Sequence, residues 1–283
     1  MAIAGNGLGG AEGSFAASQP LDAARPRLGG AELLLVLGAV PLWALSVWWM
    51  QAMDMQGRFD AGAFAPFLLL WVVMMGAMML PSVAPAVGVH RRVMRRRARG
   101  GANVTGWSAA FVTGYLAAWT AVGVVAFVAL QLLSATLGDL SDADLASRLI
   151  APTALVAAVY QATPLKRTCL RRCRSPFDFL LSRWREGRGG ALRMGAEHGA
   201  YCVGCCVLLM AVLVAFGAAS VTWMALVAAA IAGEKLLPPR LLAGGMALAV
   251  ALAVLALVAL VEPSLLPGID GMGDMGGPMT RGS

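Results

Sequence analysis

Residues 64–89 read FAPFLLLWVVMMGAMMLPSVAPAVGV, a stretch that contains no charged side chain. A membrane-spanning helix needs about 20 mostly apolar residues, so this stretch is long enough to cross a bilayer. Six arginines follow between Arg91 and Arg99. Basic residues collect on the cytoplasmic side of membrane helices. The stretch therefore predicts a membrane-spanning helix that runs inward.

Further apolar segments of similar kind fill most of the chain. Only 13% of its residues are charged, against roughly 25% in a soluble domain. Including the first stretch, the predicted spans cover residues 31–53, 64–89, 107–133, 149–162, 199–219, 221–237 and 241–261. The fourth span is short and contains Pro152. We therefore predict an all-α, polytopic integral membrane bundle of about seven transmembrane helices.

The distribution of basic residues orients this bundle. With the N-terminus inside, the outer segments hold three of the 22 lysines and arginines, and the inner segments hold the other nineteen. Basic loops resist translocation, so the N-terminus is predicted inside and the C-terminus outside. The arginine runs then serve as membrane anchors, and no nucleic-acid partner is expected. We predict a disordered cytoplasmic tail over residues 1–30, a transmembrane domain over 31–261 and a disordered outer tail over 262–283.

One imidazole and three thiols lie close together at the start of the fifth predicted span. His198, Cys202, Cys205 and Cys206 fall on one face of a helix at 100° per residue. Three cysteines within five positions beside a histidine indicate metal or redox chemistry. Inert packing remains the alternative, because a free cysteine behaves as a small apolar residue.

Cys169 and Cys173 form a second pair, four residues apart, just past the fourth span. On a helix both side chains point the same way. Arginines occupy positions 167, 171, 172 and 174, and positive neighbours lower the pKa of a thiol. We therefore expect reactive thiolates here that serve metal binding or redox exchange. An interfacial loop with two incidental cysteines is the alternative.

Four methionines follow one another in pairs on the second span, at Met74, Met75, Met78 and Met79. Thioethers are soft, neutral ligands that suit Cu(I) and suit zinc poorly. A methionine stripe at helical spacing is also the pattern of ordinary core packing. Both interpretations stay open on spacing alone.

Glu234 is the acidic residue of most interest, near the inner end of the sixth span. An ionisable group inside a span marks either a function or an internal ion pair. Lys235 follows it directly and could partner it at the membrane surface. His90, which precedes Arg91 and Arg92, is expected to be an ordinary interfacial residue.

The predicted orientation brings all these donors into the cytoplasmic half of the bundle. That compartment is reducing, so the cysteines should remain thiols. Soft ligands in a reducing place favour Cu(I), although zinc also accepts cysteine and histidine. The candidate metal ligands are Cys202, Cys205, Cys206, His198, Cys169, Cys173, Met74, Met75, Met78, Met79 and Glu234.

These motifs together resemble an uncharacterised bacterial family of predicted metal-binding integral membrane proteins, the domain of unknown function 2182. The resemblance covers residues 64–239. It rests on MMGAMMLPS (74–82), YQATPLK (160–166), Cys169 with CRSP (173–176), Gly195, HG (198–199), YC (201–202), GCC (204–206) and EKLLP (234–238). The resemblance implies a bacterial inner-membrane location and an association with metal, and it adds weight to the methionines and to Glu234.

The leading hypothesis from the sequence is a membrane metal-handling protein that binds Cu(I) near the cytoplasmic face for transport, buffering or delivery. Its expected partners are membrane lipid and a metal-donor or metal-acceptor protein, and its oligomeric state is open. A membrane thiol oxidoreductase and a non-catalytic assembly or scaffold subunit are the alternatives. Nothing resembles a nucleotide loop, a hydrolytic triad or a paired-carboxylate site, so enzymatic activity is left open and a non-enzymatic role is favoured.

Overall fold

The computed structural model describes residues 30–52, 61–97, 103–138, 143–216, 220–237 and 245–262. These residues form helices and the short connections between them, with no strand, which confirms the predicted all-α class. The helices are α1 (Gly30–Ala52), the 3-10 helix η1 (Ala61–Ala63), α2 (Phe64–Arg97), α3 (Val104–Leu137), α4 (Ala143–Gln161), α5 (Pro164–Arg174), α6 (Pro176–Ser182), α7 (Gly187–Ala215), α8 (Val221–Leu236) and α9 (Met246–Val261). Almost all of the two predicted tails lies outside the described residues.

Each of the seven predicted spans coincides with a helix, namely α1, α2, α3, α4, α7, α8 and α9. Among the described residues, α1, α2, α3 and α7 are long and apolar enough to cross a membrane. Large apolar side chains such as Val125 and Leu260 are exposed on the outer faces of the bundle. Contiguous exposed apolar surface fits contact with lipid. The fold is that of a helical membrane bundle, and the count of seven crossings remains a prediction.

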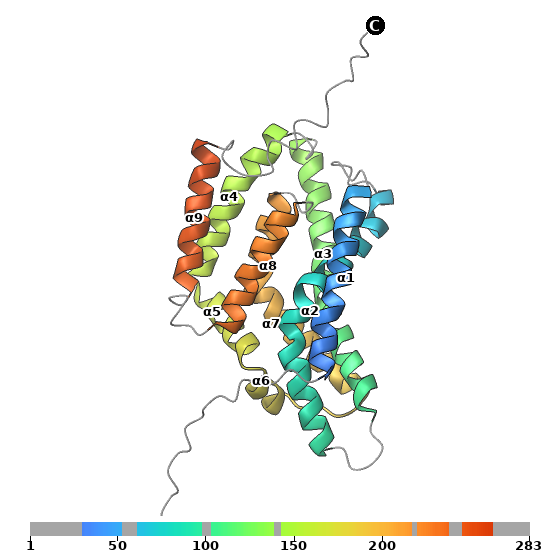
Figure 1. The fold of residues 1–283 in the computed structure, drawn as a ribbon. Helices are drawn as coiled ribbons and strands as arrows, with labels where there is room; N and C mark the ends of the chain where they lie inside the picture. The colour runs from blue at the N-terminus through green and yellow to red at the C-terminus, as the bar shows by residue number, and fades with distance from the viewer. Residues whose placement is uncertain are drawn as a thin grey trace, which may run out of the picture.

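The basic segments gather at one end of the bundle. The first turn of α1 meets the last turns of α2 there, through an ion pair of 3.4 Å between Glu32 and Arg92. Figure 1 shows α5 and α6 at this same end, where α4 finishes and α9 starts. This arrangement is the one that the predicted cytoplasmic side requires, because it places the arginines of α2 and α5 together.

Helices α2 and α7 both continue beyond the apolar spans predicted for them. Helix α2 runs on to Arg97 instead of ending at Val89, and α7 begins at Gly187 instead of Gly199. The added turns carry polar and basic residues, which fit the space outside a hydrocarbon core. The long basic segment between α4 and α7 contains helices α5 and α6.

Glycines allow α3 and α7 to pack with their backbones in contact. A Cβ added to Gly195 of α7 would overlap the carbonyl oxygen of Phe111, and one added to Gly114 of α3 would overlap that of Leu192. Gly199 also faces α3, at the four-residue spacing from Gly195 that close helix pairs use. This close approach presses the side chains of α3 against the part of α7 that carries the cysteines.

Candidate metal centre

The three cysteines of α7 form a buried cluster at the basic end of the bundle. Cys202, Cys205 and Cys206 are each only 1% exposed. Their sulfur atoms all lie within 4.8 Å of one another, and the sulfurs of Cys205 and Cys206 are 3.2 Å apart. All three are free thiols. The three thiols that the sequence places on one helix face therefore lie close together in the structure.

This spacing is compatible with a single metal ion. A thiolate lies about 2.3 Å from a bound zinc ion, so two sulfurs on one such ion are at most about 4.6 Å apart. The three sulfurs of the cluster lie within a similar span. Small side-chain movements are enough to place them around one ion.

Helix α5 brings the second pair of cysteines to the same cluster. The sulfur of Cys173 lies 3.7 Å from that of Cys205. Cys169 packs on the backbone of α7 at Gly204, where an added Cβ would lie 2.6 Å from the Cys169 sulfur. The hydroxyl of Tyr160 donates to the carbonyl oxygen of Gly204 and fixes this contact. Both α5 thiols are only partly buried, so they extend the buried cluster toward the surface.

The arginines around Cys169 and Cys173 do not activate these thiols as predicted. Burial instead raises the pKa of the Cys169 thiol. The guanidinium of Arg167 donates to the carbonyl oxygen of Ala162, and that of Arg171 donates to the hydroxyl of Thr168. The predicted lowering of the pKa was therefore wrong for Cys169, where burial decides the direction of the shift.

The positively charged group beside the thiols is the ammonium of Lys235. The sequence did not indicate that Lys235 would contact a cysteine. Its ammonium donates to the sulfur of Cys202 across 3.0 Å and to the hydroxyl of Ser82 across 3.0 Å. The Tyr115 hydroxyl also lies 2.9 Å from the Cys202 sulfur. Hydrogen bonds from charged or polar donors stabilise a thiolate. Cys202 is therefore the thiol best prepared to carry a negative charge.

Glu234 lies next to Lys235 in sequence, but its side chain contacts helix α5 and not the thiols. Its carboxylate forms a 2.6 Å ion pair with Lys166 of α5, and the two side chains are 3% and 2% exposed. The guanidinium of Arg174 donates to the backbone carbonyl of Glu234. The alternative in which Glu234 pairs with Lys235 was wrong. Glu234 is also absent from the cluster of possible ligands, and it ties α5 to α8.

The methionine pairs of α2 are buried, but they differ in position. The sulfur of Met79 lies 4.0 Å from the sulfur of Cys202 and 3.9 Å from the hydroxyl of Ser82. Met78 instead lines a cavity of about 250 Å³ between α1, α2 and α8, which Ser82 also lines. Met74 and Met75 belong to the core cluster. Among the described residues, Met79 is thus the methionine whose sulfur meets a cysteine.

The two histidines are packed among aromatic rings. His198 is buried, with its ring 5.2 Å from that of Phe179, and its Nδ1 has no hydrogen-bond partner among the described residues. It is not part of the three-thiol cluster. His90 was expected at the interface, and this was wrong. It is fully buried, and its ring stacks on Phe111 at 5.2 Å.

Comparison with known proteins points to copper. The model of a family described as a copper chaperone (PpoB2) matches residues 68–260. This range includes every candidate ligand. The match supports the metal-related family that the motifs implied, although it does not carry the name of the family that they resemble. No curated protein and no solved structure matches the chain.

Proposed function

Because the chain belongs to the PpoB2 copper chaperone family, we propose that it holds Cu(I) in the buried thiol cluster and exchanges it with a partner protein through α5. Cys202, Cys205 and Cys206 are the holding ligands. Cys173 and Cys169 are the exchange ligands. The chain does this in the bacterial inner membrane, at the cytoplasmic face.

One observation carries this proposal: three buried sulfurs lie within 4.8 Å of one another. A free cysteine also packs well as a small apolar residue, so burial of the thiols does not by itself indicate a ligand. Thiolates are, however, among the preferred ligands of Cu(I). The family match and this cluster together support a copper-handling role.

The surroundings of the cluster favour Cu(I) over zinc as the cargo. Met79 offers a thioether beside Cys202, and thioethers suit Cu(I). Structural zinc sites close four cysteine or histidine ligands around the ion. The imidazole of His198 is packed among rings outside the thiol cluster, so a fourth zinc ligand would have to be Cys173, which is only partly buried. One Cu(I) ion with three thiolates carries a net charge of −2, and the ammonium of Lys235 offsets one of these charges.

The exchange path follows the sulfur atoms from the surface inward. Cys169 and Cys173 are partly exposed, Cys173 lies 3.7 Å from Cys205, and Cys205 lies 3.2 Å from Cys206. Copper then moves by replacing one thiolate at a time, so it is never without a ligand. The methionines Met74, Met75 and Met78, buried on the same helix as Met79, offer thioethers deeper in the bundle.

The test is metal binding by the purified full chain under reducing, oxygen-free conditions. We expect about one Cu(I) per chain in the wild type by mass spectrometry, and near-zero copper when Cys202, Cys205 and Cys206 are all changed to Ser. The exposed Met246→Leu variant, on α9, is the control and should bind like the wild type. Equal, near-zero copper and zinc in the wild type and the triple variant would remove the proposal.

The exchange step has its own test. Cys173→Ser and Cys169→Ser should retain copper at equilibrium and slow its transfer to a thiol-bearing acceptor. Transfer is followed by the gain of copper on the acceptor. Unchanged transfer in the double variant would show that copper leaves by another path.

A thiol oxidoreductase is the second candidate, since Cys205 lies 3.2 Å from Cys206 and 3.7 Å from Cys173. Closing the Cys205–Cys173 pair to a disulfide of about 2.05 Å needs a modest approach of α5 to α7. Cys205 and Cys206 are neighbours on one helix, and their Cα atoms, about 3.8 Å apart, are closer than disulfide geometry normally has. Reversible loss of one thiol pair under mild oxidant in metal-free protein, without copper binding, would favour this function. A scaffold subunit would still form its normal partner complex after replacement of all five cysteines.

A further inference from the structure

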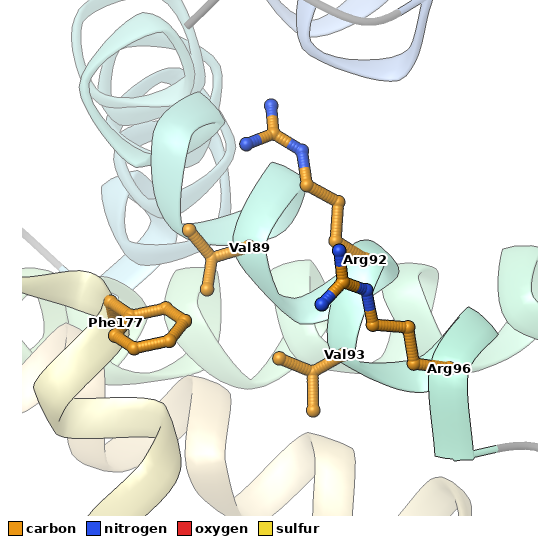
Figure 2. A pocket seen from close by; sticks show the side chains of 5 residues that line it. All are labelled: Val89, Arg92, Val93, Arg96 and Phe177. Atoms are coloured by element: carbon orange, nitrogen blue, oxygen red, sulfur yellow. The ribbon is translucent and has the colours of Figure 1, made fainter. Parts of the chain in front are cut away.

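A small groove lies at the basic end of the bundle, between α2 and α6. Val89, Val93 and Phe177 form its apolar part, and Arg92 and Arg96 line it as well. Figure 2 shows the ring of Phe177 facing the two valines across the groove, with both arginines on the α2 side. The groove therefore pairs an apolar surface with two guanidiniums at a spacing of one helical turn.

The size of the groove restricts what it holds. Its volume is about 150 Å³. A single water needs only about 10–15 Å³, whereas pockets that enclose a whole drug-sized ligand have about 300–1,000 Å³. The groove thus fits part of a larger molecule, with the remainder outside.

Helix α6 places this groove at the level of the membrane surface. Its residues Phe179 and Leu180 are buried in the core, whereas Phe177 and Leu181 are about half exposed, at 55% and 46%. A short helix with one apolar face in the protein and another directed outward lies along the interface of a bilayer. Helix α6 thus presents apolar side chains on the side away from the core.

The two arginines differ in how much of their charge is already balanced. Arg92 shares an ion pair of 3.4 Å with Glu32. A guanidinium has five N–H donors, so one such contact leaves donors for a second anion. Arg96 is exposed and forms no ion pair with any residue that the structure describes. Guanidiniums bind phosphate groups in a bidentate manner.

We propose that this groove binds an anionic phospholipid of the cytoplasmic leaflet. The phosphate of the head group lies between Arg92 and Arg96, and one acyl chain starts over Val89, Val93 and Phe177 before entering the bilayer. Basic pockets on the cytoplasmic side of membrane helices bind anionic head groups in this way. The proposal is independent of the metal site and holds whether or not the thiols bind copper.

Native mass spectrometry of the full, delipidated chain tests the site. Phosphatidylglycerol and phosphatidylcholine with the same acyl chains are added separately. We expect the wild type to retain phosphatidylglycerol at least about tenfold better. Arg92→Gln with Arg96→Gln should abolish the preference. Arg91→Gln with Arg95→Gln removes the same charge from residues of the same helix that do not line the groove, and this variant should keep it.

Two further measurements distinguish a bound phospholipid from bound free phosphate and from nonspecific attraction of anionic lipid to the basic end of the bundle. Inorganic phosphate in 100-fold excess should not displace the bound lipid, because the apolar part of the groove contributes to binding. Phe177→Ala should weaken retention of phosphatidylglycerol several-fold. Displacement by inorganic phosphate would overturn the lipid assignment. Equal binding of both lipids by the wild type, or equal loss of preference in the two double variants, would overturn the site itself.

Discussion

The ammonium of Lys235 lies 3.0 Å from the sulfur of Cys202 in the interior of the bundle. A hydrogen bond to a charged partner contributes about 1.5–3 kcal/mol. We predict that Lys235→Met lowers the affinity for Cu(I) by about 10- to 100-fold, because the thiolates then lose their balancing charge. Lys235→Arg keeps the charge and should recover part of this loss. Chelator competition measures both, and unchanged affinity in Lys235→Met would contradict the role.

Met79 gives a second prediction, on the identity of the metal. Met79→Leu removes the thioether 4.0 Å from Cys202 and keeps the side-chain volume. Such a swap costs less than about 1.5 kcal/mol of stability. Affinity for Cu(I) should fall about tenfold and affinity for zinc should not change, since zinc does not use thioethers. Met94→Leu, buried on the same helix, is the control, and a similar loss there would assign the effect to packing.

The ion pair of Lys166 and Glu234 predicts a pattern of stability across three variants. Replacing one partner leaves the other charge buried and unpaired, at a cost of about 3–5 kcal/mol. Lys166→Met and Glu234→Met should therefore each lower the unfolding temperature strongly. The double variant should recover most of the loss, because two apolar side chains leave no charge. Thermal unfolding followed by circular dichroism measures this. A double variant less stable than both single ones would show that the pair is not an isolated unit.

The glycines of α7 predict opposite effects at two positions. Gly195→Ala places a methyl group against the backbone of α3 at Phe111 and should destabilise the protein by about 1–3 kcal/mol. Gly189→Ala meets no atom within 4 Å, and it should stabilise the helix by up to about 1 kcal/mol. Thermal unfolding of the two variants side by side checks the contrast. Equal unfolding temperatures would mean that α3 and α7 pack less closely than described.

The helices and the thiol cluster were predictable from the sequence because each depends on one segment alone. Apolar length locates a membrane helix, and the spacing of Cys202, Cys205 and Cys206 fixes their common face. The structure bears out both. The approach of Cys173 to Cys205 followed from the orientation of the helices, since basic residues placed both at one end of the bundle.

Other parts of the candidate site depend on which helices are neighbours, and one sequence does not give this. Glu234 and Lys235 point about 100° apart on one helix. Only the packing of α5 on one side and α7 on the other decides that the carboxylate meets Lys166 and the ammonium meets Cys202. The burial of His90 has the same origin. Its neighbours in sequence are arginines, but the helix face on which it lies packs on Phe111.

Helix α8, one of the predicted membrane crossings, is short for a bilayer. Its 16 residues span about 24 Å at 1.5 Å per residue, whereas the hydrocarbon core is about 30 Å thick. Lipids relieve such a mismatch by thinning locally beside the short segment. If α8 crosses the membrane as predicted, such thinning would occur beside the helix that carries Lys235 and would shorten the distance between bulk water and the cargo. A thicker membrane should therefore make the protein slower to load, through no change in its ligands.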